Sequence, residues 1–438
     1  MAKKISLFPI LLVNFIGTLG FSLVMPFLVF LVTKFGGNAQ IYGLLGAAYP
    51  AFQLIGAPIL GKWSDIYGRK KILLLSQAGT LLSWLIFLGA LLLPITTLLD
   101  LKTSFMGEFL VTVPLLVLFL ARAFDGLTGG NISVANAYLA DITEEKDRSK
   151  NFGKMAISAN MGFILGPALA GLLGFTVLAE TLPVLAATAI SLAATLVIAF
   201  VLQESRPCVL TENPRKGTVT KIFGQENKDC YELAGAGEIK FKDILKQKNL
   251  PYLLTLYFFI YLGFSLFYTA FPVHAVQGLK WSIFDLGIFF TVLGSLMIFV
   301  QGPVLSRLTK KISDARLIIA GNLILATNFV LMVSSDKIYI YSAAVLFAVG
   351  NGIMWPSVMS ILSKAAGKKY QGAVQGFAGS VGSLASIIGL IGGGIFYGAF
   401  GATTFLISAG VIYFIFFLSF RLLRIEKNMQ PETPTNNR

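Results

Sequence analysis

Twelve long apolar runs constrain this 438-residue chain more than any other feature. A helix needs roughly 20 apolar residues to cross about 30 Å of hydrocarbon, where it satisfies its own backbone hydrogen bonds. Only 13% of the residues are charged, far fewer than in an ordinary soluble domain. We therefore predict an all-α, polytopic membrane protein with twelve transmembrane helices. The runs are Leu7–Val32, Ile41–Leu60, Ile72–Leu93, Val111–Leu139, Met155–Leu178, Leu182–Leu202, Leu250–Val276, Phe284–Val304, Leu317–Val333, Ile338–Leu362, Ala373–Phe396 and Thr403–Leu423.

The runs divide six and six about a polar stretch. This division predicts a six-helix bundle at residues 1–202, a linker at 203–249, a second bundle at 250–424 and a tail at 425–438. A faint internal repeat supports the division, since "GKWSDIYGRKK" from residue 61 is weakly similar to "GPVLSRLTKK" from residue 302. The stretch "EIKFKDILKQKN" that ends the linker fits either a short interfacial helix or a solvated segment.

The placement of the basic residues predicts the orientation. Loops after the odd-numbered runs hold only Lys34, Lys102, Lys280 and Lys337, whereas loops after the even-numbered runs and both tails hold many more bases. By the positive-inside rule both termini are cytoplasmic, which suits a bacterial inner (plasma) membrane. The net charge of +14 thus reflects topology, and we expect no nucleic-acid partner because no basic stripe with interleaved aromatic residues stands apart from the runs.

Cysteine and histidine usage argues against metal and cofactor chemistry. Cys208 and Cys230 fall in the cytoplasmic linker, where thiols stay reduced, and their spacing fits no zinc site. The one histidine, His274, lies near the outer end of its run. Because the sequence has neither a glycine-rich nucleotide loop nor a hydrolase triad, we expect no enzyme activity and no cofactor. We also expect a monomer in the lipid bilayer that handles a small-molecule substrate.

Arg122 and Asp125 are the charges that lie deep within a run. A charge at the middle of a bilayer costs about 2.5–3.5 kcal/mol, so each one needs a reason. Their spacing of three residues places both on one helix face, where Arg122 would hold Asp125 ionised. The pair either locks helix packing or couples a bound proton to the movement of a solute, and we favour the second interpretation.

A glycine-rich segment and a set of polar and aromatic residues complete the candidates. Gly162, Gly166 and Gly171 recur along one helix that Pro167 interrupts, a pattern that allows close helix packing and a kink. Polar and aromatic residues deep in the runs could line a mostly apolar pocket for an amphipathic organic solute, although each one alone more often serves packing. They are Asn14, Phe21, Tyr49, Gln53, Asn160, Tyr257, Tyr261, Tyr268, Gln301, Asn351, Trp355 and Gln375.

The segment "GKWSDIYGRKK" resembles the signature between the second and third helices of the major facilitator superfamily. The matching residues are Gly61, Asp65, Gly68, Arg69 and Lys70. "RAFDG" from residue 122 resembles the proton-relay motif of that superfamily, and "GFILGPALAG" from residue 162 resembles the motif of its antiporters, with Ala170 in place of a second glycine. "MPFLVF", "YLADITEEKDRSKNFG" and "MWPSVMSILSKAAGKKYQGAVQG" resemble the tetracycline-efflux branch of the drug:proton antiporters.

The resemblance implies two bundles that rock about a central cavity. It implies that Gly61 and Gly68 form a tight cytoplasmic turn, and that Asp65 latches the halves together by facing a helix N-terminus near Gln371–Ala373 as well as Arg69. Tetracycline exporters carry an acid in the first helix, where this chain has Gly17 with Asn14 the nearest polar residue. That difference shifts the expected proton coupling to Asp125.

Three functions remain open on these grounds. The first is a proton-coupled antiporter that exports drug-like amphipathic compounds. The second keeps the fold but exports one dedicated metabolite, such as a siderophore or a lipid-like compound, or takes up a solute by symport. The third is a membrane receptor or scaffold without transport.

Overall fold

The computed structural model describes residues 6–428 except 105, 145–146, 175, 177, 179, 206–208, 211–227 and 230–245. Most of the predicted interfacial helix at the end of the linker therefore lies outside the described residues, as do Cys208 and Cys230. The chain divides into two compact units: unit 1 is Met1–Ala236 with Ser282–Phe290, and unit 2 is Gly237–Trp281 with Thr291–Arg438.

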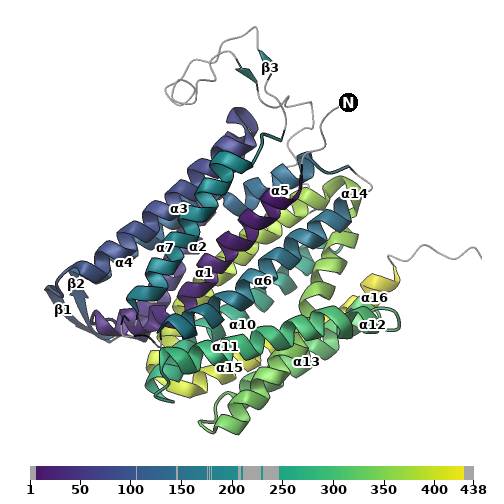
Figure 1. The fold of residues 1–438 in the computed structure, drawn as a ribbon. Coiled ribbons are helices and arrows are strands. Elements are labelled where there is room, and N and C mark those ends of the chain that lie inside the picture. Colours follow the sequence, from purple (N-terminus) through teal and green to yellow (C-terminus); the bar gives the residue numbers. More distant parts are fainter. Residues whose placement is uncertain are drawn as a thin grey trace, which may run out of the picture. The chain divides into compact units, whose positions relative to one another are not determined.

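Unit 1 is built from long helices and a small hairpin (Figure 1). Its elements are α1 (Phe8–Lys34), α2 (Ala39–Tyr67), α3 (Arg69–Leu92), β1 (Thr97–Thr103), β2 (Gly107–Thr112), α4 (Val113–Thr128), α5 (Asn131–Asp141), α6 (Arg148–Gly174), α7 (Thr181–Leu196), the π-helical turn η2 (Val197–Val201) and the two-residue strands β3 (Val209–Leu210) and β4 (Lys228–Asp229).

The remaining helices, of which the start of α11 belongs to unit 1, follow the linker. They are α10 (Leu250–Gln277), α11 (Ile283–Phe299), the π-helical turn η3 (Val300–Val304), α12 (Leu305–Leu308), α13 (Asp314–Leu331), α14 (Lys337–Phe400), the 3₁₀ turn η4 (Gly401–Thr403), α15 (Thr404–Ser419) and α16 (Arg421–Lys427).

The helices confirm the predicted all-α membrane class. Within the described residues, ten helices are long and apolar enough to cross a bilayer, or eleven when the bent pair Phe8–Val24 and Phe27–Lys34 counts as one span. The last candidate, Phe377–Lys427, has 51 residues, about twice the length one crossing needs. It covers most of the predicted run Ala373–Phe396 and all of Thr403–Leu423. Large apolar side chains such as Phe200 and Phe417 are 82% and 68% exposed, as residues that face lipid should be.

Two predicted boundaries are wrong for one reason. The segment from Gly61 to Tyr67, expected as a loop, continues α2, and the segment between Leu362 and Ala373 is helical within α14. Polar residues there mark where the hydrocarbon ends, because water tolerates their charges, but they do not end the helix. α14 has 64 residues, about 96 Å at 1.5 Å per residue, too long for a single crossing.

A β-hairpin between α3 and α4 was not predicted. β1 and β2 pair antiparallel from Thr97 opposite Thr112 to Thr103 opposite Gly107, at one end of α3 and α4 (Figure 1). The Asn38 amide fixes it by donating to the carbonyls of Met106 (2.7 Å) and Glu108 (3.1 Å). The same amide caps α2, since its oxygen accepts from the backbone N–H of Ile41.

Candidate functional site

The predicted pair of Arg122 and Asp125 lies on α4 and is buried. The residues are 5% and 7% exposed, and Arg122 Nη1 lies 3.6 Å from Asp125 Oδ2. The two groups form an ion pair, and their separation is longer than that of an ordinary hydrogen bond. Asp125 stands twelve residues after Val113, about 18 Å along the helix, which places it near the middle of the candidate span Val113–Asp141.

Two aromatic rings lie beside the guanidinium. Arg122 Cζ lies 5.0 Å from the ring centre of Tyr49 and 5.9 Å from that of Phe21, and these two rings are 5.4 Å apart. A cation over an aromatic face gains roughly 0.5–2 kcal/mol, more when water is excluded. Arg122 Nε has no hydrogen-bonding partner among the described residues. The structure therefore brings together four predicted residues, Phe21, Tyr49, Arg122 and Asp125.

The predicted helix Val111–Leu139 is broken beside this pair. α4 ends at Thr128, and α5 begins at Asn131 after two glycines. Side chains of neighbouring helices donate hydrogen bonds to the carbonyl groups at the break. Ser76 donates to the carbonyl of Thr128 (2.5 Å) and Gln53 to that of Gly129 (2.9 Å). Broken backbone at membrane depth persists only where such partners exist. Gln53 also donates to the Tyr49 hydroxyl (2.9 Å), so one amide links the break to the aromatic residue beside Arg122.

Close packing fixes α4 against its neighbours through glycines. A Cβ on Gly126 would lie 2.4 Å from the carbonyl oxygen of Tyr49, and one on Gly56 would lie 2.0 Å from that of Leu127. Both distances are shorter than any real contact, so α2 and α4 touch at backbone distance there. The position of the ion pair is therefore set by rigid backbone contacts.

The glycine-rich helix α6 packs in the same way against α1. A Cβ on Gly166 would lie 2.0 Å from Ser22 Oγ, and one on Gly162 2.8 Å from the backbone of α1. Pro167 lies within α6, and Gly171 follows it in the same helix. The amide of Asn14 donates to the Met155 carbonyl (2.9 Å) and to Ser158 Oγ (2.8 Å). Both donors of Asn14 thus join α1 to α6.

Unit 2 gathers three other predicted residues, from α10 and α14. The rings of Tyr257, Tyr261 and Trp355 are mutually adjacent, with centroids 5.0, 5.4 and 5.2 Å apart. Asn351 lies one turn before Trp355 and is 7% exposed, and its amide approaches Met297 Sδ at 3.9 Å. Pairs of such rings gain roughly 0.5–1.5 kcal/mol beyond their buried area. The trio forms an aromatic cluster inside unit 2.

Four predicted residues remain: Gln301, Asn160, Tyr268 and Gln375. Gln301 falls in the π-helical turn η3, a distortion often found at functional sites. Asn160 on α6 is exposed, and Tyr268 is 37% exposed. The side chain of Gln375 lies outside the described part of the chain.

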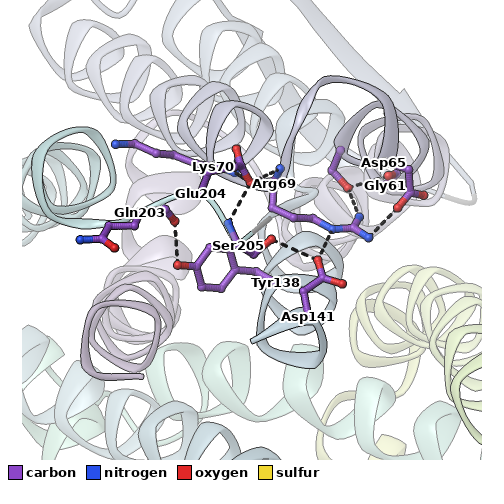
Figure 2. A network of polar contacts seen from close by, with 10 residues as sticks. Gly61, Asp65, Arg69, Lys70, Tyr138, Asp141, Gln203, Glu204 and Ser205 are labelled. Carbon is purple, nitrogen blue, oxygen red and sulfur yellow. Dashed lines mark hydrogen bonds and ion pairs between the residues drawn. The ribbon is translucent and has the colours of Figure 1, made fainter. Parts of the chain in front are cut away.

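Arg69 is the centre of the α2–α3 network, which we define as Asp65, Arg69, Asp141, Glu204 and Ser205 (Figure 2). Its guanidinium pairs with Asp65 (2.6 Å) and with Asp141 (3.0 Å), and it donates to Ser64 Oγ (2.6 Å). Asp141 also accepts from Ser205 Oγ (3.1 Å). Since Arg69 is only 8% exposed, two carboxylates and a hydroxyl replace the water that its charge has lost.

Glu204 closes the network by capping α3. Its carboxylate accepts from the backbone N–H groups of Arg69 (2.9 Å) and Lys70 (3.2 Å), which are otherwise unsatisfied at a helix start. Gly68 has φ 101°, and a Cβ there would lie 2.6 Å from Glu204 Oε2, so this turn needs glycine twice over. Gly61, by contrast, is helical with nothing within 4 Å of a Cβ, so the expectation that it forms the turn is wrong.

Unit 2 carries a counterpart with its charges exchanged. Glu426 of α16 accepts from the backbone N–H groups of Asp314 (3.1 Å) and Ala315 (3.2 Å) at the start of α13. Asp314 in turn pairs with Lys364 of α14 (2.6 Å). In each unit a carboxylate near the end of the last helix caps the third, and an ion pair joins that helix start to the fourth. The arrangement supports the predicted internal repeat.

Sequence reasoning missed Asp141, Glu204, Ser205 and Glu426. Their partners lie 64 to 135 residues away in the chain within unit 1, so no local pattern connects them. Their position in the sequence could have indicated them, because each acid lies where an apolar run ends. A carboxylate there can reach the start of a neighbouring helix.

Comparison with known proteins identifies the family. The model of the Major Facilitator Superfamily matches residues 10–390 and 253–438. The chain is 28% identical over 382 residues to the tetracycline resistance protein, class D, of Salmonella ordonez, covering 86% of each chain. It is 27% identical over 401 residues to multidrug resistance protein 2 of Bacillus subtilis (strain 168), covering 90% of this chain and 89% of the relative.

Solved structures show the same fold at low identity. A bacterial homologue of the human lysosomal transporter Spinster, in an inward-facing and unoccupied conformation, matches with a TM-score of 0.71 at 11% identity and 98% coverage of both chains. A D-xylose–proton symporter matches with a TM-score of 0.68 at 14% identity, again over 98% of both chains. The helices, the paired networks and the family match lead to one conclusion: the chain is an integral membrane transporter of the Major Facilitator Superfamily.

Proposed function

We propose that this protein is a secondary active antiporter that exports amphipathic, drug-like organic compounds in exchange for protons, by alternating access. The buried pair of Arg122 and Asp125 carries the proposal. A carboxylate at the middle of a membrane segment changes charge when it binds a proton, and a change of charge there is worth several kcal/mol. The similarity to proteins named for tetracycline and multidrug resistance supports export of drug-like solutes.

Protonation of Asp125 would change the local electrostatics by one full charge. The ionised carboxylate neutralises Arg122 at 3.6 Å. When a proton neutralises Asp125, the guanidinium loses this charge partner and keeps the quadrupoles of Tyr49 and Phe21. A cationic or polar solute and a proton would therefore compete for interaction with the Asp125 carboxylate. Such competition is the requirement for exchange.

The proposal includes a membrane orientation and a latch. Both termini lie in the cytoplasm of a bacterial cell, and Asp65 joins the two bundles near Gln371–Ala373, whose side chains are outside the described residues. Asp65 is suited to a second contact because its side chain is 40% exposed although it already pairs with Arg69. Asp65→Asn should impair transport while membrane insertion stays normal, and undiminished transport would rule the latch out.

Proteoliposomes with an imposed pH gradient test the coupling. The solutes are tetracycline, ethidium and further toxic amphipathic compounds, and external pH is recorded together with solute flux. Solute-dependent proton movement in the opposite direction supports antiport. Co-directional accumulation indicates symport, and inactivity across the panel indicates a dedicated metabolite exporter or a receptor.

Asp125→Asn should abolish transport driven by the gradient but retain solute exchange at equal pH. The matched control is Asp100→Asn, the same change at an exposed position of β1, which should pump as the wild type does. Wild-type pumping by Asp125→Asn would eliminate Asp125 as the proton carrier.

A further inference from the structure

A small cavity lies inside unit 1, next to Asp125. Its volume is about 30 Å³, and its lining comes from α1, α2, α3, α4 and α7. The residues that decide its chemistry are Gly17, Tyr49, Gln77, Thr80, Asp125 and Ser191. Sequence reasoning selected neither Gln77, Thr80 nor Ser191. We refer to this cavity as the vestibule.

Two of the polar residues that line the vestibule are almost completely buried. Gln77 is 1% exposed and Ser191 3% exposed, and Gln77 Nε2 donates to Ser191 Oγ at 2.9 Å. Gln77 Oε1 has no hydrogen-bonding partner among the described residues. A buried amide oxygen left in that state costs about 1–3 kcal/mol. A water molecule that reached this oxygen would remove the cost.

The volume is right for water and too small for a solute. A buried water molecule needs about 10–15 Å³ of cavity volume, so the vestibule has room for about two water molecules. Organic ligands occupy pockets of roughly 300–1,000 Å³. The glycine at position 17 contributes no side chain that would fill the space. Water is therefore the occupant that fits both the size of the vestibule and the polar side chains that line part of it.

Thr80 connects this space to the carboxylate. It lies three residues after Gln77 on the same face of α3, and its side chain interacts with Asp125. Polar groups thus follow one another from Ser191 through Gln77 and Thr80 to Asp125. In the described part of the chain, Asp125 is the only carboxylate that lines the vestibule.

We propose that Gln77, Thr80 and Ser191 hold a short chain of water inside unit 1 through which Asp125 gains and loses its proton. A hydrated proton in the vestibule transfers to a carboxylate oxygen of Asp125, which leaves neutral water and a neutral carboxylic acid. The reverse transfer returns the proton to water and restores the charge that faces Arg122. The three residues act as positioning residues, since they order the water that reaches Asp125. The proposal rests on the proton-coupled antiport proposed above.

Infrared difference spectroscopy tests the water path without any solute. The purified full-length protein is titrated from high to low pH, and the carboxylic acid band that is missing in Asp125→Asn is assigned to Asp125. The rate at which this band shifts after transfer to D₂O measures how fast water reaches the group. Gln77→Leu and Thr80→Val should slow the shift by about tenfold or more, the effect of roughly 1.4 kcal/mol on a barrier.

Two further variants control for packing. Ser83→Ala removes another buried hydroxyl of α3, which donates to the Gly79 carbonyl of its own helix (3.0 Å) and does not line the vestibule. Thr80→Ser keeps the hydroxyl. Both should exchange as fast as the wild type. Equal exchange rates in Gln77→Leu, Thr80→Val and the wild type would overturn the proposal.

Transport assays separate this proposal from the proposed function. Gln77→Leu and Thr80→Val should lower the rate driven by a pH gradient, while solute exchange at equal pH stays near wild type. A purely structural role would lower both rates together and would count against the water path. If the wild-type band never titrates, or no proton moves with solute, the antiport proposal itself fails. If antiport holds and only the vestibule variants behave as wild type, the failure belongs to the water path alone.

Discussion

Glu204→Gln should destabilise unit 1 even though the substitution preserves the size of the side chain. The carboxylate holds the first two N–H groups of α3 at 2.9 and 3.2 Å. Hydrogen bonds to a charged acceptor contribute about 1.5–3 kcal/mol and neutral ones about 0.5–1.5. Glutamine keeps one neutral oxygen that can still accept from both N–H groups, as Glu204 Oε1 does at 2.9 and 3.3 Å. The change from a charged to a neutral acceptor then weakens the shorter bond by about 1–1.5 kcal/mol.

The helix dipole adds a further loss. A negative charge at a helix N-terminus contributes about 0.3–1 kcal/mol, and glutamine lacks that charge. The total expected change in unfolding free energy is therefore about 2 kcal/mol. For a unit of 150–250 residues, 1 kcal/mol lowers Tm by about 2–4 °C, so we expect a decrease of about 4–8 °C.

Thermal unfolding in detergent measures the effect. Intrinsic fluorescence is suitable because Trp63 and Trp84 lie in unit 1, whereas Trp281 and Trp355 lie in unit 2. Glu426→Gln, the same substitution at the corresponding cap of α13, should lower the transition of unit 2 by a similar amount. Replacement of the tryptophans of one unit by phenylalanine assigns each transition.

Glu180→Gln is the matched control. Glu180 pairs with Lys34 at 3.3 Å, and the Lys34 side chain is 52% exposed. Surface pairs of this kind contribute about 0–1 kcal/mol, so the control should lower Tm by less than half as much as Glu204→Gln. Equal decreases in the two variants would refute the argument that Glu204 caps α3.

Two further substitutions test the backbone at the same junctions. Gly68→Ala should lower Tm by several degrees, since the residue has φ 101° and the new methyl group would meet Glu204 Oε2 at 2.6 Å; in a Glu204→Ala background the steric part of the loss should vanish, and a loss of unchanged size would argue for φ strain alone. Gln53→Leu should cost about 1–3 kcal/mol by leaving the Gly129 carbonyl without its 2.9 Å partner. Thermal unfolding measures this cost too, and a Tm equal to that of the wild type would show that the break after α4 needs no side-chain support.

Sequence periodicity predicted the membrane helices because each one needs only its own apolar residues and backbone. It could not predict where α2 ends. The polar segment after Leu60 marks the edge of the hydrocarbon, yet the helix continues to Tyr67 and stops only at Gly68, where the backbone adopts a positive φ. The β1–β2 hairpin was missed for a related reason, since its pairing and its tie to Asn38 depend on residues from separate loops.

The candidate site was predicted in its charged and aromatic residues and in Gln53, whereas its other polar supports were missed. Arg122 and Asp125 stand out because a charge in lipid is costly. Gln77, Ser76 and Ser191 do not stand out, since polar uncharged residues are common in membrane helices and gain meaning only from what faces them. Asp141 and Glu204 lie at the ends of runs, and only the fold brings them to Arg69.

The repeated networks of the two units should differ in energy although they match in geometry. The side chains of Arg69 and Asp141 are 10% and 12% exposed, so Asp141→Asn removes charge-assisted bonds from a poorly hydrated arginine and should cost about 2–3 kcal/mol. Lys364 in the corresponding pair is 57% exposed, so Lys364→Met should cost less than about 1 kcal/mol. Thermal unfolding of the two variants compares the costs directly. Similar losses would mean that burial does not set the strength of these pairs, and that the exposed pair of unit 2 is as structural as the buried pair of unit 1.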